Sequence, residues 1–185
     1  MLFSASDDGT IKLWDLNLRT CVRQFTGHVG QVQSMKLLMA GECDDEEPSE
    51  EEEEEDIRQE VGPRTGTTKN PPVQKNQNLL VPKRKKPVLI SGSLDNTIKL
   101  WDIETGKATR TYFGHIEGVW GVACDKLRLV SASHDRTIKV WSREEGSCTS
   151  TLVGHQAAVS CIALGEDKII SGSDDWTVKV WSFSG

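Results

Sequence analysis

No stretch of the chain is long and apolar enough to span a bilayer, and Met1 to Gly9 lacks the basic start and apolar run of a signal peptide. We therefore expect a soluble intracellular protein with no membrane partner. The five cysteines are scattered, odd in number and never in CxxC spacing: Cys21, Cys43, Cys124, Cys148 and Cys161. This pattern argues against a disulfide framework and a zinc site, so we interpret them as ordinary small apolar residues.

The chain also lacks a charge bias outside one segment. Its net charge is −6, but residues 42–86 hold thirteen acidic and eight basic side chains, which leaves fifteen acidic and fourteen basic side chains elsewhere. A nearly neutral body gives no reason to expect nucleic-acid binding. The chain has no G-x-S-x-G elbow and no phosphate-binding loop, so we predict neither an enzyme nor a bound cofactor or metal ion.

What the sequence does contain is an internal repeat. The segments SASDDGTIKLWD, SGSLDNTIKLWD, SASHDRTIKVWS and SGSDDWTVKVWS begin at Ser4, Ser91, Ser131 and Ser171 and align without a gap. The last three tryptophans of these segments are spaced by forty residues, and a GH dipeptide follows each of the first three, so that its histidine lies fourteen residues after the tryptophan. Such a period indicates one supersecondary unit repeated along the chain.

Each unit has the pattern of a tight β-hairpin. Short alternating runs such as VLISGS and TIKLWD are separated by turn residues. Ile98 and Leu100 would point to one face of their strand, and Lys99 and Trp101 to the other. Both faces need cover, so we predict an all-β fold in which each sheet is flanked by two similar sheets.

The GH and WD markers at about forty-residue spacing resemble the WD-repeat family, whose four-stranded blades surround a central channel. The resemblance covers residues 1–41 and 87–185 and implies an incomplete β-propeller ring of two complete and two partial blades. Residues 1–41 would form the partial first blade and the start of the second, and residues 87–185 the rest of the second, the third and a partial fourth. We expect this open arc to associate through its exposed ends, at Phe3–Ser6 and Thr177–Trp181.

The resemblance also implies a buried tetrad in each blade. Its members would be His28, Ser91, Asp95 and Trp101; His115, Ser131, Asp135 and Trp141; His155, Ser171, Asp175 and Trp181; and, in the first unit, Ser4, Asp8 and Trp14. The residue types also fit a Ser-His-Asp catalytic triad. Three equivalent sites are what a fold requires to satisfy buried polar groups, whereas catalysis needs one exposed nucleophile, so we interpret the tetrads as structural.

The distance along the chain from His28 to Trp101 is 47 residues longer than the distance between the equivalent histidine and tryptophan of the other units, which indicates an insertion. Residues 42–86 combine an acidic run, Glu42–Asp56, with a polar stretch rich in Pro, Gly and Asn, and we predict that they are disordered. In the WD-repeat family, the strands of a blade are named a to d outward from the channel, and the segment would join strands a and b, on the face opposite the GH turns. At its end, Lys83, Arg84, Lys85 and Lys86 resemble a nuclear import signal that would bind an import receptor, which predicts a protein of the nucleus as well as the cytoplasm. The alternative is a solubilising flank that balances the acidic run.

Partners of WD-repeat proteins often dock on the face with the GH and b–c turns. By position, the exposed candidates on that face are Gln31, Gln33, Leu94, Asn96, Trp120, His134, Arg136, Ser160, Asp174 and Trp176. Trp120 and Trp176 lie outside the tetrads, and aromatic residues near arginine are the usual anchors of interfaces. Trp120 could instead pack within its strand.

A narrower resemblance rests on GHVGQVQ, the acidic insertion after it, GHIEGVWGVACDKLRLVSASHDRTIKVW and the Trp-Ser-Phe ending. These features are similar to fungal sulphur-controller proteins, in which an F-box precedes the repeats. There the propeller presents substrates to a cullin-type ubiquitin ligase that represses sulphur assimilation genes. These 185 residues contain no F-box, so the resemblance implies a substrate-recognition role only. The alternative is a general assembly scaffold in ribosome biogenesis, chromatin or signalling.

Overall fold

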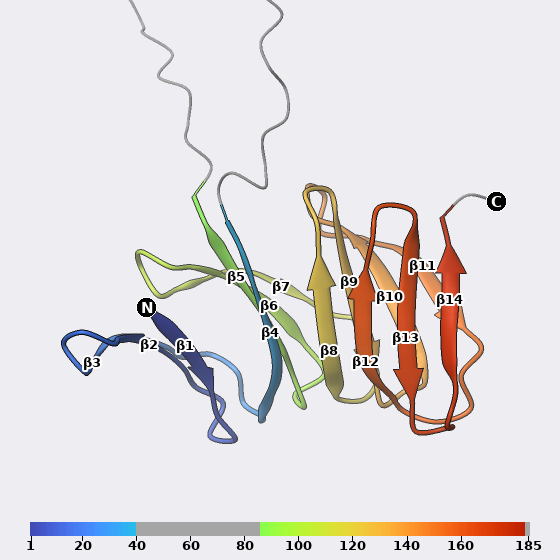
Figure 1. The fold of residues 1–185 in the computed structure, drawn as a ribbon, viewed down its shortest axis with the longest axis horizontal. Coiled ribbons are helices and arrows are strands. Elements are labelled where there is room, and N and C mark those ends of the chain that lie inside the picture. The colour runs from blue at the N-terminus through green and yellow to red at the C-terminus, as the bar shows by residue number, and fades with distance from the viewer. Residues whose placement is uncertain (40–85, 184–185) are drawn as a thin grey trace, which may run out of the picture. The chain divides into compact units, whose positions relative to one another are not determined.

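The computed structural model describes residues 1–39 and 86–183, and every regular element in these ranges is a β-strand. Fourteen strands form four antiparallel sheets that follow one another in chain order (Figure 1). The first two sheets contain β1 (Leu2–Ala5), β2 (Ile11–Asp15) and β3 (Thr20–Phe25), then β4 (Val32–Leu38), β5 (Val88–Ser93), β6 (Ile98–Asp102) and β7 (Ala108–Tyr112). The last two contain β8 (Val119–Cys124), β9 (Arg128–Ser133), β10 (Thr137–Ser142) and β11 (Cys148–Val153), then β12 (Val159–Leu164), β13 (Lys168–Ser173) and β14 (Val178–Ser182).

The strand order within each sheet follows the chain, because consecutive strands are joined as hairpins. The second and third sheets have four strands each. The first sheet, β1–β2–β3, lacks the strand equivalent to β4, and the last, β12–β13–β14, lacks the strand equivalent to β7. The prediction of two complete and two partial blades is therefore confirmed.

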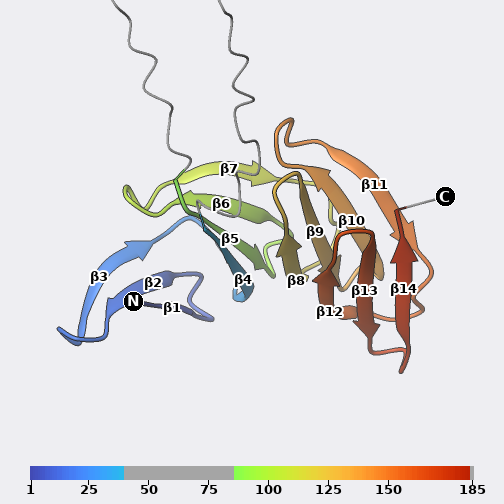
Figure 2. The same ribbon diagram turned by 45° about the horizontal axis from the view of Figure 1, so that its top comes forward.

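The sheets pack face to face, and the alternation of side chains along each strand supplies both faces (Figure 2). In the second sheet, Leu89 and Trp101 pack against Ile11 and Phe25 of the first sheet. The opposite face of the same sheet, with Ile90 and Ile98, packs against Trp141 and its neighbours in the third sheet. The predicted cover on both faces of a blade is thus present. The strands β4, β8 and β12 contact one another in turn across the sheet boundaries.

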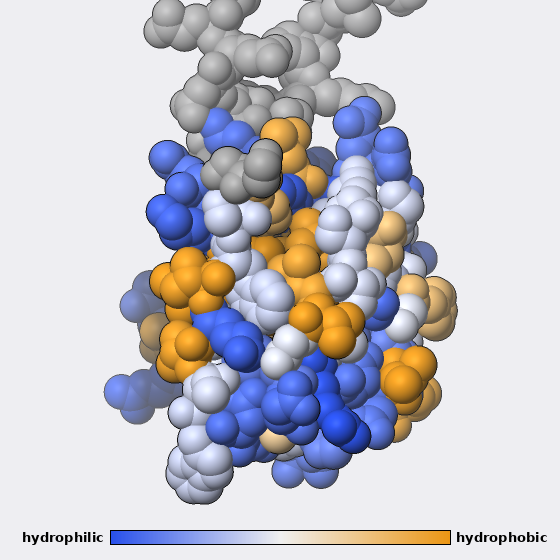
Figure 3. Space-filling view, turned by 90° about the vertical axis from the view of Figure 1, so that its right-hand side faces the viewer, coloured by the Kyte–Doolittle hydropathy of each residue, from blue (hydrophilic) through white to orange (hydrophobic). Residues whose placement is uncertain are grey.

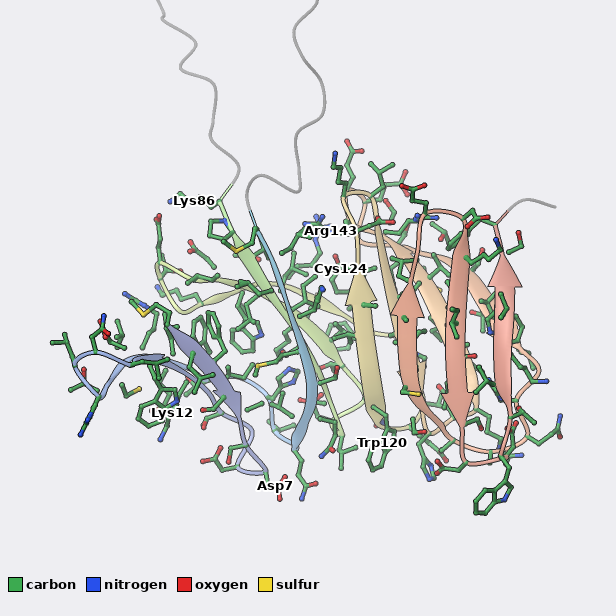
Figure 4. All side chains as sticks on the ribbon, in the orientation of Figure 1. Asp7, Lys12, Lys86, Trp120, Cys124 and Arg143 are labelled. Carbon is green, nitrogen blue, oxygen red and sulfur yellow. The ribbon has the colours of Figure 1, made fainter. Side chains whose placement is uncertain are left out.

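The two ends of the sheets carry different connections. Figure 4 places Asp7 and Trp120 at one end and Lys86, Cys124 and Arg143 at the other. The first end has the turns between β5 and β6 and their equivalents, and β4 ends and β5 begins at the second (Figure 1). The end of β4 and the start of β5, which flank the insertion, therefore lie at the end opposite the hairpin turns. Its predicted disorder falls almost wholly on residues 40–85, outside the described part of the chain.

The four described cysteines are free thiols that differ in exposure. Cys21, Cys148 and Cys161 are exposed free thiols, and only Cys124 is half-buried, while Cys43 lies outside the described residues. Cys21 and Cys148 lie on β3 and β11, which are edge strands with one neighbour. Cys161 lies in the last sheet, in the position of Gly121 of the third sheet, which contacts the sheet that follows it. Within the described ranges, no helix could cross a membrane.

Candidate functional site

A chain of hydrogen bonds runs through the second sheet from its core to its turn. The indole Nε1–H of Trp101 on β6 donates to Ser91 Oγ on β5 at 2.8 Å, and Ser91 Oγ lies 2.8 Å from His28 Nε2. His28 Nδ1 lies 2.7 Å from Asp95 Oδ2 in the β5–β6 turn. His28 precedes β4, so the chain of hydrogen bonds links the connection from the first sheet to the hairpin of the second.

The same hydrogen bonds recur in the next two sheets. In the third sheet, Ser131 Oγ lies 2.9 Å from Trp141 Nε1 and 2.7 Å from His115 Nε2, and His115 Nδ1 lies 2.7 Å from Asp135 Oδ2. In the last sheet, the equivalent distances among Trp181, Ser171, His155 and Asp175 are 2.9, 2.8 and 2.8 Å. The four side chains named in each of these units are therefore brought together.

The hydrogen bonds of the tetrad suit a neutral histidine. Ser91 Oγ accepts from the indole, and its own hydrogen can donate to His28 Nε2 when that nitrogen is unprotonated. The imidazole is neutral and donates from Nδ1 to Asp95. Burial lowers the pKa of His28 below 6.5, and the hydrogen bond and charge of Asp95 only partly offset this effect.

The aspartates are held in the ionised form. Burial raises the pKa of Asp95, but hydrogen bonds from Thr97 and His28 and from the backbone N–H of Val29 more than offset this, so the net pKa lies below 3.8. The pKa of Asp135 is also lowered, because hydrogen bonds from His115 and Thr137 outweigh the effect of burial. For Asp175, a hydrogen bond from Thr177 is the largest cause of the lowered pKa.

The geometry does not give the serine access to a substrate. Its hydroxyl has the partners of a triad serine, but Ser91, Ser131 and Ser171 are buried, and the indole of the tetrad donates to the oxygen that would have to attack. Among the described residues, no cluster of His, Cys, Asp or Glu could hold a metal ion. The tetrads therefore connect each hairpin to the preceding sheet.

The first unit has only part of the network. Trp14 Nε1 donates to Ser4 Oγ at 2.8 Å, and Asp8 Oδ1 accepts from the Thr10 hydroxyl at 2.6 Å. Trp14 is half-buried, because no sheet among the described residues covers its side of the first sheet. Trp181 is half-buried too, in contrast to the fully covered Trp101 and Trp141.

The four hairpin turns share one backbone feature. In each, the residue after the tetrad aspartate has positive φ: 79° at Gly9, 68° at Asn96, 69° at Arg136 and 66° at Trp176. Its N–H donates at 3.2 Å to the carbonyl three residues back, which describes a tight turn ending in a left-handed residue. Glycine and asparagine adopt this conformation readily, whereas Arg136 and Trp176 are strained there. Trp176 is 98% exposed.

A second backbone irregularity lies at the start of strands β4, β8 and β12. The pairing register with the next strand shifts between Val32 and Ser34, between Val119 and Gly121, and between Val159 and Cys161. The extra residues of these β-bulges are Gln33, Trp120 and Ser160, and a bulge redirects its side chain out of the regular alternation. Trp120 is 37% exposed, and Figure 4 shows it near the turn end of β8.

The ten residues of the predicted partner-binding face differ in accessibility. Exposed members are Gln31, Trp120, His134, Arg136, Ser160, Asp174 and Trp176, whereas Gln33, Leu94 and Asn96 are half-buried. Asn96 Nδ2 donates to the carbonyl of Ile116, and His134 Nδ1 lies 2.7 Å from Glu117 Oε2. Leu94 and Asn96 are therefore less available than their sequence positions indicate.

Sequence reasoning missed two apolar residues on this face. Val29 and Ile116 directly follow the histidines of two GH dipeptides and are 94% and 80% exposed. Their backbone N–H groups donate to Asp95 and Asp135, so the backbone is held at the turn while the side chains remain exposed. Their fixed position directly after the GH dipeptide is the sequence signal that could have identified them as exposed residues of this face.

Four hairpin sheets, three of which carry the same hydrogen-bonded tetrad, define a repeat protein whose sheets are propeller blades. The family model described as WD domain, G-beta repeat matches residues 1–15, 82–102, 106–142 and 146–182. The chain belongs to this WD-repeat family.

Among curated relatives, the chain is similar to a probable E3 ubiquitin ligase complex SCF subunit, sconB, of Arthroderma otae. The two are 38% identical over 150 residues, which cover 69% of this chain and 22% of the relative. It is also 38% identical to an F-box protein of Saccharomyces cerevisiae, over 69% of this chain and 20% of that protein. The chain thus spans about a fifth of the length of these relatives.

Two solved structures of designed proteins share the arrangement of sheets. The computationally designed Ika4 protein superposes with a TM-score of 0.65 and 26% identity, over 97% of this chain and 83% of the designed chain. The designed Ika8 protein superposes with a TM-score of 0.66 and 26% identity, over 98% of this chain and 42% of the designed chain.

Proposed function

We propose that this chain is a non-catalytic protein-binding scaffold that forms the substrate-recognition propeller of a cullin-type ubiquitin ligase adaptor regulating sulphur metabolism. The observation that carries the proposal is the left-handed turn position, where two blades have Arg136 and Trp176 in place of the favourable glycine or asparagine. Strained residues that the fold does not need are concentrated at functional sites. Trp and Arg are also the residue types that contribute most to protein interfaces.

The surroundings of these two residues fit a protein partner. Arg136 is exposed and has no ion-pair partner in the described part of the chain, so its guanidinium is available to an acidic group. Trp120 and Ile116 add exposed apolar surface on the same blade, and Trp176 does so on the next. The names of the relatives support a ubiquitin ligase role for this surface, because both belong to proteins with an F-box or an SCF assignment.

Competition in a cell tests the proposal. The chain is overproduced in a fungus that has an intact sulphur-controller protein, under sulphur-replete conditions. If it binds the same substrate, it will titrate that substrate away from the ligase, and transcripts of sulphur assimilation genes will rise. Trp176→Asn and Arg136→Asn should each weaken this effect.

Two controls separate lost binding from lost folding. Both substitutions place a residue suited to positive φ in the turn, so each variant should be as stable as the parent or up to about 1 kcal/mol more stable in a denaturant melt. Leu127→Asn changes an exposed residue at the opposite end of the sheets and should retain the full effect. Unchanged transcripts, with co-purification of ribosomal or chromatin proteins and no cullin, would instead identify a general assembly scaffold.

Nuclear entry through the basic block is part of the proposal. Lys83, Arg84 and Lys85 lie outside the described residues, while Lys86 is exposed and donates a hydrogen bond to Glu104. Both side chains of that pair are mostly exposed, and such ion pairs contribute little stability. An import receptor with an acidic groove would therefore displace Glu104 at small cost.

A further inference from the structure

A cavity of about 330 Å³ lies at the junction of the second and third sheets. Two of its lining residues, Lys86 and Arg143, lie at the end of the sheets opposite the hairpin turns (Figure 4). The other lining residues belong to the second sheet or directly precede it, and they are Pro87, Val88, Trp101, Asp102 and Thr109. The lining therefore combines apolar residues with two cations and one carboxylate.

Arg143 occupies a position that is apolar in the other three sheets. The residue directly after the strand with the tetrad tryptophan is Leu16 in the first sheet, Ile103 in the second and Phe183 in the last. Ile103 packs against the apolar cluster between the first and second sheets. The repeat itself therefore does not require an arginine at this position.

A second exchange leaves space beside Arg143. At the junction of the third and last sheets, the guanidinium of Arg128, at the start of β9, lies 4.1 Å from the centre of the Phe183 ring. The equivalent residues at the junction of the second and third sheets are Val88, at the start of β5, and Arg143. Because valine is much shorter than arginine, these two side chains do not fill the junction, and a cavity remains.

The guanidinium of Arg143 is bound on one side only. Its Nη1 donates to the carbonyls of Asp125 and Lys126 at 2.7 and 2.9 Å, and these are its hydrogen bonds within the described part of the chain. Its Nε is buried and has no hydrogen-bond partner there. In arginine, Nε–H and one Nη2–H are parallel and bind both oxygens of a carboxylate or phosphate. The edge of Arg143 without a partner is therefore the edge that recognises oxyanions.

The backbone of Arg143 is held from both sheets. Its N–H donates to the carbonyl of Leu127 at 3.0 Å, and its carbonyl accepts from Arg110 Nη1 of β7 at 2.7 Å. A binding group that is fixed in advance loses less conformational freedom when a ligand binds. Arg143 is thus positioned at the junction before any ligand arrives.

The other charges of the cavity already have partners. Asp102 Oδ1 accepts from the backbone N–H of Glu104 at 2.8 Å, and this hydrogen bond lowers the pKa of Asp102 below 3.8. The ammonium group of Lys86 is paired with the carboxylate of Glu104. Among the charged side chains of the lining, Arg143 is therefore the one without an ion-pair partner in the described part of the chain.

The size and lining of the cavity indicate more than an inorganic ion. Its volume lies at the lower end of the range for pockets that bind small organic molecules, and it exceeds that of a single phosphate or carboxylate group. Pro87 and Val88 supply apolar surface for the remainder of a ligand. In the view onto the last sheet, mainly hydrophilic side chains lie at the upper end, which is the end of Lys86 and Arg143, and hydrophobic side chains gather below them (Figure 3).

We propose that this cavity binds a small organic acid, whose carboxylate or phosphate group lies on the Nε edge of Arg143 and whose apolar part packs on Pro87 and Val88. Because Nε is covered, binding requires a small rotation that turns this edge towards the ligand. Arg143 and Val88 belong to different sheets, so the ligand would join the second sheet to the third. The site is independent of the proposed partner-binding face, which lies at the opposite end.

A titration of the full, isotope-labelled chain followed by NMR tests the proposal. Benzoate and phenyl phosphate are the probes, because each joins one oxyanion group to an apolar ring. Benzyl alcohol has the ring without the charge, and inorganic phosphate has the charge without the ring. We expect both organic anions to shift the Nε–H signal of Arg143 and to raise the melting temperature of the chain. The two comparison compounds should bind much more weakly.

Two variants copy the other sheets of the chain. Arg143→Ile introduces the residue type of the second sheet and should abolish the response to both organic anions. Val88→Arg combined with Arg143→Phe reproduces the contact between Arg128 and Phe183, so it should fill the cavity and also abolish binding. Arg136→Asn removes an exposed arginine at the opposite end and is the matched control, which should bind like the parent. Circular dichroism checks the fold of each variant.

Three results would overturn the proposal. The first is a parent chain that responds to neither organic anion. The second is a folded Arg143→Ile chain that binds them as tightly as the parent does, because the anion would then lie elsewhere. The third is binding of inorganic phosphate or benzyl alcohol as tight as that of the organic anions, because the site would then not require both the charge and the apolar part.

Discussion

At the scale of the residue, the tetrad is a set of polar groups that satisfy one another inside an apolar interface. Trp101 supplies apolar area and one hydrogen-bond donor. Ser91 Oγ accepts from this donor and is also hydrogen-bonded to His28, and Asp95 receives two further hydrogen bonds from Thr97. Removal of one member leaves the others buried without a partner, which costs more than the lost bond itself.

Trp141→Ala should therefore be severely destabilising. The substitution removes a buried side chain that packs edge-on against Tyr112 and His115, and it leaves Ser131 without its donor. We expect the free energy of unfolding to fall by about 3–5 kcal/mol. Ser131→Ala, which removes much less apolar area, should cost less. A denaturant melt of Trp141→Ala that superposes on the parent would show that the tetrad does not support the fold.

Acid should weaken the fold in two stages. The pKa of His28 is lowered below 6.5 in the folded state, so the unfolded chain binds its proton first, and stability falls as the pH drops below about 6.5. The lowered pKa values of Asp95, Asp135 and Asp175 add a second loss below about 3.8. Urea melts between pH 8 and pH 3 measure both stages.

His28→Asn should make the free energy of unfolding depend less on pH between pH 7.5 and pH 5, because no titrating group remains at that position. His134→Asn, which changes an exposed histidine outside the tetrads, is the control for general histidine loss. A parent that becomes more stable between pH 7 and pH 5 would contradict the assignment of His28 as a neutral buried group.

At the scale of the element, the features that repeat with the period of the sequence could be predicted from the sequence alone. The hairpins, the tetrad positions and the absence of one edge strand from each end sheet all followed from alignment of the four units, because equivalent residues make equivalent contacts. The exposure of single side chains did not follow. Leu94 is half-buried because Gly118 of the adjacent blade packs against it, and Cys161 is exposed because no described sheet covers its side of the last sheet. Both depend on neighbours that a repeat pattern does not specify.

Excision of the insertion tests how independent the blades are of it. Replacement of residues 39–87 by the connection Asp125–Leu127, which joins β8 to β9, should preserve all four sheets, because β4 and β5 pair along their full length up to Leu38 and Val88. The free energy of unfolding should not fall, since a shorter loop costs less closure entropy. In the parent, hydrogen exchange in residues 42–86 should be fast. Protection there equal to that of the strands would contradict the predicted disorder.

At the scale of the whole molecule, the basic block should control location. A fluorescent fusion in which Lys83, Arg84, Lys85 and Lys86 are all changed to Ala should shift towards the cytoplasm, because the import receptor loses its cationic ligand. Glu104→Gln is the matched variant, since it frees Lys86 from its one described ion pair and should leave nuclear accumulation intact. If the quadruple variant accumulates in the nucleus like the parent, the block is a charged spacer.

The pairing of β4 with β5 also has a consequence for the order of folding. Three-residue connections join β8 to β9 and β12 to β13, whereas about fifty residues separate Leu38 from Val88. Closing the longer loop costs about 2.5 kcal/mol more entropy, and such distant pairs form slowly. Strand β4 should therefore dock last onto a preformed β5–β6–β7 hairpin unit. Because His28 connects β4 to the first sheet, that late step would also bring β1–β2–β3 against Trp101, so the amino-terminal sheet is the last to join the folded body.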